Sequence, residues 1–130
     1  MNVTQVLLVG TSILTSAFSG YVAAQETHSP VVRIAELEID PAQLERYKAV
    51  VKEEMETSVR IEPGVLAIYC VAEKDNPYRL RFFEMYADEQ AYRTHLESSH
   101  FKKYVAATQP MIRSRKLIET VPVQLTAKRQ

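Results

Sequence analysis

The sequence predicts a single α+β domain in which helices cover one face of an antiparallel sheet, and three observations lead to this prediction. The chain has 130 residues, which leaves room for one domain. Segments with the length and β-branched content of strands alternate with segments of helical periodicity. Their order along the chain is β-α-β-β-α-β, which is the ferredoxin-like arrangement.

The first half of the domain has the pattern of a strand, a helix and a second strand. Residues 31–39 are rich in β-branched side chains, and Asp40 and Pro41 then suit the cap and the first turn of a helix. Apolar residues recur at helical spacing until Pro63-Gly64 ends the run. Residues 65–71 form the next expected strand. Alternation places apolar side chains on both of its faces: Val65, Ala67, Tyr69 and Val71 on one, and Leu66, Ile68 and Cys70 on the other.

The second half begins with a hairpin. Residues 73–77 have turn composition, and residues 79–86 form the return strand. Asp88 opens a second helix that carries His95. Ser98 or Ser99 then caps a third helical piece. Residues 116–121 are expected to form the last strand of the sheet.

The two apolar faces of residues 65–71 predict a homodimer. Helices are expected to cover one face of the sheet, and one short chain has nothing left to cover the other face. A second copy that packs sheet against sheet would bury it and give a two-fold dimer.

Residues 1–24 carry no charged side chain and have the pattern of a secretory leader. An apolar stretch from Val6 to Phe18 precedes the small residues Ala23 and Ala24, after which cleavage is expected. The protein is then periplasmic or secreted. Because the leader lacks the lysine or arginine that usually precedes the apolar stretch of a signal peptide, two other interpretations of residues 1–24 stay open: an uncleaved membrane anchor and a disordered cytosolic tail. The expected organisation is a leader (1–24), a linker (25–30), a domain (31–125) and a polar tail (126–130).

Composition argues against several classes of function. Lysine plus arginine equal aspartate plus glutamate at 16 each, so nucleic-acid or anionic-membrane binding is not expected. Cys70 is the only cysteine, which excludes an intrachain disulfide and a cysteine-based metal site. It is expected to be a buried strand residue. The sequence has neither a glycine-rich phosphate loop nor a nucleophile elbow.

Glu84 is an acidic residue among apolar neighbours. By strand alternation it shares a face with Leu80, Phe82 and Tyr86. Burial raises the pKa of a carboxyl group toward the range that is useful for proton transfer, unless a cation pairs with it. The alternative is a structural role, in which Glu84 forms an ion pair with Arg33 or Arg81.

Two histidines follow on the helical segments. His95 shares a helix face with Tyr92, and His100 begins the next helical piece, where the helix dipole favours a neutral imidazole. His100 is therefore expected to be available as a base or hydrogen-bond donor, and a structural role for each histidine stays open. A metal site built from Glu84, His95 and His100 lacks a recognised spacing, so no metal is expected.

Several motifs together resemble the antibiotic biosynthesis monooxygenase (ABM) domain family, over roughly residues 31 to 125. They are Asp88-x-x-Ala91-Tyr92-x-x-His95-x-x-Ser98-x-His100-Phe101-x-x-Tyr104, Ser58-x-Arg60-x-Glu62-Pro63-Gly64, Phe83-Glu84-Met85-Tyr86 and Leu117-Ile118-Glu119-Thr120-Val121-Pro122. The resemblance implies a ferredoxin-like dimeric α+β barrel. It also implies a pocket between sheet and helices, lined by the matching strand glutamate and helix histidine.

The family includes cofactor-independent quinol or anthrone oxygenases, haem-degrading enzymes and an isomerase of a phosphorylated autoinducer-2 sugar. The anthrone and haem types rely on pocket asparagine and tryptophan, whereas this chain has no tryptophan. Beyond the leader its only asparagine, Asn76, lies in a turn. The Ser58–Gly64 motif and the histidines resemble the quinol-oxygenase-like and isomerase branches. The predicted export argues against a phosphorylated sugar as the substrate, because such intermediates are normally cytoplasmic.

The expected function is a cofactor-independent monooxygenase of a small quinol-like or enolisable compound. His100 is expected to abstract or relay a proton and Glu84 to orient it. Neither a cofactor nor a metal is expected. A non-catalytic ligand-binding protein and an isomerase of a sugar-like dicarbonyl are the alternatives. The expected substrate-binding residues are Arg60, Tyr69, His95 and Tyr104.

Overall fold

A computed structural model describes residues 29–128 of the chain. The predicted leader and most of the predicted linker lie outside the described residues. Between residues 29 and 128, no helix combines the length and the apolar character that crossing a membrane requires.

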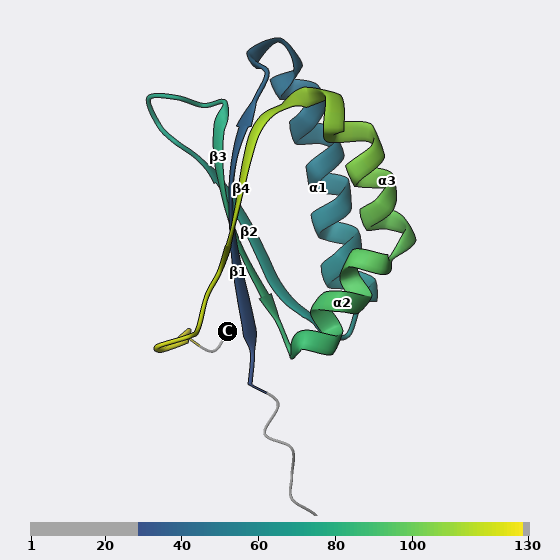
Figure 1. The fold of residues 1–130 in the computed structure, drawn as a ribbon, viewed down its shortest axis with the longest axis vertical. Coiled ribbons are helices and arrows are strands. Elements are labelled where there is room, and N and C mark those ends of the chain that lie inside the picture. Colours follow the sequence, from purple (N-terminus) through teal and green to yellow (C-terminus); the bar gives the residue numbers. More distant parts are fainter. Residues whose placement is uncertain (1–28, 129–130) are drawn as a thin grey trace, which may run out of the picture.

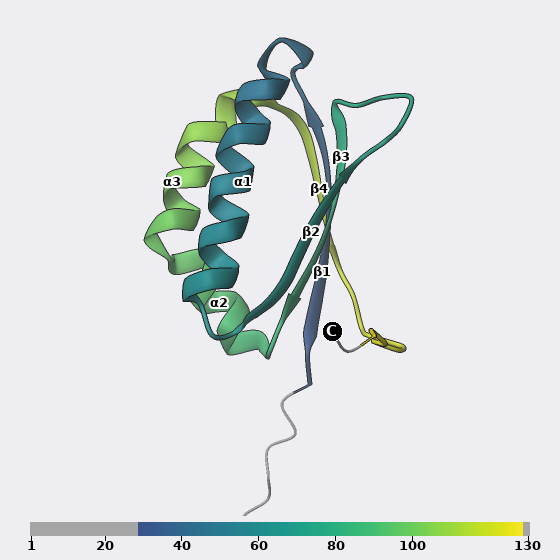
Figure 2. The ribbon, with the colours of Figure 1, turned by 180° about the vertical axis from the view of Figure 1, so that it is seen from behind.

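The sheet has four antiparallel strands in the order β2-β3-β1-β4. In the described part of the chain, the helices all lie on one face of the sheet and none lies on the opposite face (Figures 1 and 2). This arrangement confirms the predicted ferredoxin-like α+β fold. The elements are β1 (Val31–Ile39), η1 (Pro41–Gln43), α1 (Leu44–Ile61), β2 (Val65–Ala72), β3 (Arg79–Tyr86), α2 (Glu89–Glu97), α3 (Ser99–Thr108), η2 (Gln109–Met111) and β4 (Ile112–Glu119).

Side-chain caps set the starts of the helical segments. The Asp40 carboxylate accepts a hydrogen bond from the Ala42 amide at 3.0 Å, and the Asp88 carboxylate accepts one from the Ala91 amide at 2.7 Å. The Ser98 hydroxyl caps α3 by accepting from the Phe101 amide at 3.3 Å. Because Ser98 has an extended backbone, it also separates α2 from α3. These caps satisfy amides that a helix leaves unpaired.

The core lies between the sheet and the helices. A larger cluster lies beneath α1, and a smaller one lies near the start of α2. The buried members of the two clusters are Ala35, Leu37, Ile39, Tyr47, Val51, Leu80, Phe82 and Met111 in the first, and Val31, Val65 and Tyr86 in the second.

The last strand begins earlier than predicted. It runs over Ile112–Glu119 and pairs with β1 from Ile39 opposite Ile112 to Arg33 opposite Glu119, so the prediction of 116–121 was wrong at both ends. The start was missed because residues 113–116 are polar and exposed. An edge strand tolerates such residues because only one of its sides is paired.

A β-bulge in β2 corrects the predicted faces of that strand. Val65 pairs with Tyr86 and Ala67 pairs with Met85, so Leu66 is an extra residue in the ladder. The bulge reverses the alternation, because one additional residue exchanges the faces that follow it. Val65 therefore packs on the helix side, and the prediction that it shares a face with Tyr69 and Val71 was wrong. Tyr69 and Val71 lie on the outer face and are 64% and 62% exposed.

Candidate functional site

A cavity of about 100 Å³ lies between the inner face of the sheet and helices α2 and α3. Most of its lining is apolar, and a few polar groups converge on it, which is the usual make-up of a small-molecule site. The lining residues are Ala35, Leu37, Phe82, Glu84, Tyr92, His95, Leu96, Phe101, Tyr104, Val105, Arg115 and Leu117.

His95 is the most enclosed polar residue of this lining, with 2% of its surface exposed. It lies in the last turn of α2, and its ring packs against those of Phe101 and Tyr86, with centroids 4.7 Å and 5.4 Å away. Its Nδ1 lies 2.9 Å from Oε1 of Glu62, the residue that ends α1. The aromatic contacts and this hydrogen bond hold the imidazole in one orientation.

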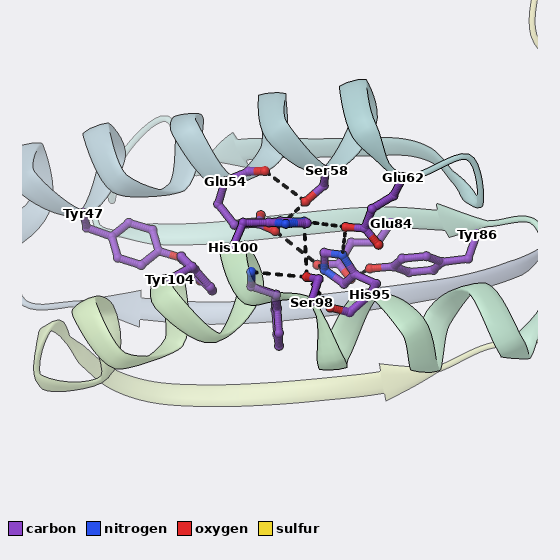
Figure 3. Close-up of polar contacts among 11 residues, drawn as sticks. Tyr47, Glu54, Ser58, Glu62, Glu84, Tyr86, His95, Ser98, His100 and Tyr104 are labelled. Carbon is purple, nitrogen blue, oxygen red and sulfur yellow. Dashed lines mark hydrogen bonds and ion pairs between the residues drawn. The ribbon is translucent and has the colours of Figure 1, made fainter.

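Glu62 joins the two histidines (Figure 3). The Oε1 atom that contacts His95 also lies 2.5 Å from Nε2 of His100. A carboxylate oxygen only accepts hydrogen bonds, so both of these nitrogens are assigned as N–H donors. Ser98 agrees with this assignment, because its hydroxyl donates to the His95 carbonyl at 2.7 Å and is left to accept from His100 Nε2 at 3.2 Å.

Glu54 lies on the other side of His95. It comes from the buried face of α1 and is only 7% exposed. Its Oε1 accepts a 2.6 Å hydrogen bond from the Ser58 hydroxyl and lies 3.7 Å from His95 Nε2. Within residues 29–128, the ion pairs of Glu54 and Glu62 are formed with histidines and not with lysine or arginine.

Glu84 reaches the cavity from β3. Its Oε2 accepts a 2.9 Å hydrogen bond from the Tyr86 hydroxyl. Burial raises the pKa of the Glu84 carboxyl above its ordinary value, and the Tyr86 hydrogen bond and the nearby His95 oppose this only in part. The alternative ion pair is not formed, because Arg33 pairs with Glu89 and Arg81 pairs with Glu73. Cys70 is only partly buried, and desolvation raises the pKa of its thiol to about 11, with a smaller contribution from Glu84.

The structure brings some of the predicted site residues together and separates others. Glu84, His95 and Tyr104 line the cavity, and the Tyr104 hydroxyl is 2.7 Å from that of Tyr47. His100 instead borders two hollows between the helices, and the carboxylate that contacts it is Glu62 rather than Glu84. The prediction that Glu84 orients His100 therefore has no contact to support it.

Arg60 and Tyr69 do not reach the cavity. Arg60 is exposed in the last turn of α1, and Tyr69 lies on the outer face of the sheet. That Arg60 and Tyr69 bind substrate oxygens stays a prediction, and neither side chain lines the cavity in this structure.

Sequence reasoning assigned no role to Glu54 or Glu62, although both are central to the site. Glu62 was noticed only as part of a motif. For Glu54 a signal was available: it lies seven residues after Tyr47 and three after Val51, on the apolar face of α1. A glutamate on a buried helix face needs a polar partner, and that requirement could have identified it.

One group of side chains has donor atoms close enough for a metal ion. Glu54, His95 and His100 each contribute one such atom, and the three atoms lie within 4.8 Å of one another. The metal site considered from the sequence had Glu84 in the place that Glu54 takes here.

The chain belongs to the antibiotic biosynthesis monooxygenase family, whose model matches residues 30–107. Membership of this family supports a general monooxygenase-type function for the chain. No functionally curated protein matches it.

Solved structures agree with this family. A candidate antibiotic biosynthesis monooxygenase from Bacteriodes thetaiotaomicron is 43% identical, with 80% of this chain and 99% of that chain covered and a TM-score of 0.75. A candidate monooxygenase from Lactobacillus acidophilus is 34% identical over 72% of this chain and 45% of its own length, with a TM-score of 0.70. A protein from Nitrosomonas europaea shares the fold at 21% identity, with 78% and 97% covered and a TM-score of 0.70.

Proposed function

We propose that the protein is a cofactor-independent monooxygenase that deprotonates a small quinol-like or enolisable compound, whose anion then reacts directly with oxygen. The observation that carries this proposal is the buried His95, held by Glu62 at 2.9 Å in a mostly apolar cavity that also contains Glu84. The family membership supports the same class of reaction.

His95, rather than His100, has the position of the base. Because Nδ1 donates to Glu62, the lone pair of the neutral ring is on Nε2. Glu62 then stabilises the imidazolium that forms when Nε2 takes a proton, as a buried carboxylate does in other histidine-dependent enzymes. His100 contacts the same Glu62 oxygen from the side of the helical hollows, which suits the relay role that the sequence predicted for it.

Glu84 is suited to bind a substrate oxygen. Burial raises the pKa of its carboxyl, so protonating it costs less than for an exposed glutamate, and the protonated form can donate a hydrogen bond to a carbonyl or to a developing oxyanion. The cavity of about 100 Å³ is of the order of an apolar cavity of about 150 Å³ that holds one benzene molecule. This size favours a single-ring substrate or one of similar volume.

The proposed reaction balances without an external reductant. A ring carbon of the quinol anion forms a C–O bond with O₂, and the O–O bond of the resulting hydroperoxide breaks. The oxygenated ring carbon loses its C–H proton as the O–O bond breaks, so one oxygen stays on the ring as a carbonyl. The other oxygen leaves as water, with the proton that His95 took from the quinol returned to the peroxide oxygens. Overall, quinol and O₂ give a hydroxyquinone and water, so the quinol itself supplies the electrons.

Oxygen uptake with a panel of chemically reduced single-ring quinols and with menadiol tests this proposal. Loss of a general base lowers rates by a factor of about 100 to 10,000, so His95→Gln is expected to fall within that range. His100→Gln is expected to lose less, because the cavity and the base stay in place. Thr94→Ala, an exposed neighbour on α2, is the control and is expected to keep the wild-type rate.

Equal uptake by the wild type and a folded His95→Gln variant would remove His95 from the mechanism. Quinol binding without oxygen uptake would instead identify a ligand-binding protein, and rearrangement of a dicarbonyl without oxygen consumption would identify an isomerase. Circular dichroism of each variant checks that the fold is retained.

A further inference from the structure

Within residues 29–128, the ion pairs of the polar cluster between the three helices include no lysine or arginine. Glu54 and Glu62 are 7% and 11% exposed at the side chain, and their ion-pair partners in the described part of the chain are His95 and His100. Buried carboxylates are costly unless a proton, a fixed cation or a metal ion neutralises them. Lysine and arginine are absent from these ion pairs, so the neutralising charge must be a proton or a metal ion.

Each of the two histidines keeps one ring nitrogen that does not contact Glu62. Glu62 engages Nδ1 of His95 and Nε2 of His100, so the remaining nitrogen of each neutral ring carries a lone pair. The free nitrogen of His95 is Nε2, and it faces Glu54 Oε1 at 3.7 Å. A cation placed between these two acceptors would interact favourably with both of them.

From this arrangement we infer that Glu54, His95 and His100 form a binding site for a divalent transition-metal ion, with zinc as the best fit. Their donor atoms lie within 4.8 Å of one another. Two histidines and one glutamate are an established ligand set for Zn²⁺ with one open position. Tetrahedral ligation at about 2.0–2.1 Å puts ligand atoms about 3.3 Å apart, so binding requires the side chains to close by up to about 1.5 Å.

Glu62 completes the arrangement as an orienting residue. A histidine that binds a metal almost always donates its other ring N–H to a carboxylate or carbonyl, which fixes the tautomer and the direction of the ring. Glu62 accepts from both histidines through one oxygen, at 2.9 Å and 2.5 Å. It is therefore a positioning residue for both ligands.

The cluster can be reached from solvent. A hollow of about 180 Å³ between α1 and α3 is bordered by Glu54 and His100, and the exposed ion pair of Lys103 with Glu53 lies at its rim. On the other side, His95 belongs to the lining of the sheet–helix cavity. An ion can thus enter between the helices without passing through the cavity.

This inference concerns the binding of an ion and does not depend on the proposed reaction. If both hold, the metal ion and the substrate proton compete for His95 Nε2, and added zinc slows oxygen uptake.

Calorimetric titration of the untagged protein with Zn²⁺ tests the site, because a histidine tag would bind the ion itself. The wild type is expected to bind one ion per chain and to melt at a higher temperature when zinc is present. Glu62→Gln is expected to bind about 10- to 100-fold more weakly, as is usual for loss of an orienting carboxylate. Glu54→Gln removes a ligand and is expected to lose at least as much.

Glu56→Gln is the matched control, because Glu56 is an exposed glutamate on the same helix. It is expected to keep the wild-type affinity and the zinc-dependent rise in melting temperature. Binding that is equally tight in Glu54→Gln and in the wild type would overturn the site, as would a wild type that fails to saturate at one ion per chain.

Titration of the wild type with Co²⁺ keeps the test independent of how the variants fold. Coordination by two histidines and a carboxylate is expected to give visible absorption bands stronger than those of the hydrated ion, at one equivalent. A spectrum that stays that of hydrated Co²⁺ would count against the site even if no variant folded. None of these measurements uses a substrate, so they separate failure of this inference from failure of the proposed reaction.

Discussion

Glu84 illustrates how the surroundings of one residue change its chemistry. It points from the sheet into the cavity, and desolvation raises the pKa of its carboxyl group. The titratable groups around it come from every neighbouring layer: Tyr86 on its own strand, Cys70 on β2, Glu54 on α1 and His95 on α2. Tyr86 and His95 favour the charged form, and Glu54 opposes it, so burial remains the largest effect.

The raised pKa of Glu84 predicts a pH-dependent effect of Glu84→Gln on stability. A carboxyl whose pKa is higher in the folded state contributes stability below its unfolded pKa, and this contribution is lost as pH rises through the folded pKa. The wild type must bury a charge above that range, whereas glutamine does not. The free energy of unfolding of Glu84→Gln relative to the wild type is therefore expected to increase from mildly acidic to neutral pH.

Urea denaturation at several pH values between these limits measures this difference. Glu56→Gln, on the exposed face of α1, is the control and is expected to show a nearly constant difference from the wild type. If the Glu84→Gln difference is instead largest at acidic pH, the carboxyl is charged in the folded state and the assigned role in substrate binding loses its basis.

At the scale of elements, the start of β2 packs closely against α2. A Cβ atom at Gly64 would lie 2.4 Å from the Cβ of Ala91. Gly64 does not have a positive φ, so the need for glycine at this position comes from the close approach and not from a left-handed backbone. The Gly64 carbonyl also accepts a 2.9 Å hydrogen bond from the Ala87 amide, which ties the end of β3 to this junction.

Gly64→Ala is expected to destabilise the fold by about 1–3 kcal/mol, which is typical of added volume in a packed region. Ala91→Gly alone costs about 1 kcal/mol through helix propensity. The double variant is expected to be more stable than the sum of the single effects predicts, because the smaller residue at 91 relieves the clash. Urea denaturation of all four proteins measures this coupling, and strictly additive effects would show that the contact is not limiting.

At the scale of the whole molecule, helices cover one face of the sheet, and within residues 29–128 no helix covers the other face (Figure 2). Tyr69 is largely exposed on this face and lies in a row with the partly buried Phe83, Ile34 and Ile118. The exposed Val71 lies in the next row, whose other members are the charged residues Arg81, Glu36 and Lys116. An exposed apolar row of the first kind is typical of an interaction site. Two-fold packing of two copies through this face remains our proposal for it.

A matched pair of substitutions tests the dimer. Val71→Lys places a charge in the proposed interface, and Val59→Lys places the same charge on α1, where Val59 is 48% exposed. Size-exclusion chromatography with light scattering is expected to give a dimer for the wild type and Val59→Lys, and a shift toward monomer for Val71→Lys. A wild type that is monomeric at micromolar concentration would contradict the proposal.

Local patterns in the sequence were sufficient for most of the fold. Short polar side chains mark helix starts because they can satisfy the first free amides. The structure confirms Asp40 and Asp88 as caps, and of the two serines that the sequence left open it shows Ser98 as the third cap. The β-α-β-β-α-β order follows from those boundaries and from hydrophobic periodicity. This order led to the prediction of a ferredoxin-like sheet, which the strand order confirms. Export, which rests on residues 1–24, remains a prediction from the sequence.

Tertiary structure decided what periodicity cannot encode. The bulge at Leu66 is a pairing irregularity between two strands, and the early start of β4 depends on its pairing with β1. In the site, His95 and His100 were recognised from the sequence because histidines at helical positions are conspicuous. Their common partner Glu62 lies 33 and 38 residues away, and only packing of the end of α1 against α2 and α3 brings it between them.

The sequence by itself determined the order of the elements, the helix caps and the family, because these depend on neighbours along the chain. It also singled out Glu84 as a carboxylate among apolar neighbours, and His95 and His100 as candidate functional histidines. Only the tertiary structure decided that Glu84 and His95 share a cavity, that His100 faces the other side of Glu62, and that Glu54 completes the cluster. The physical reason is that hydrogen bonds and charge balance depend on distances across the fold, which spacing along the chain does not determine.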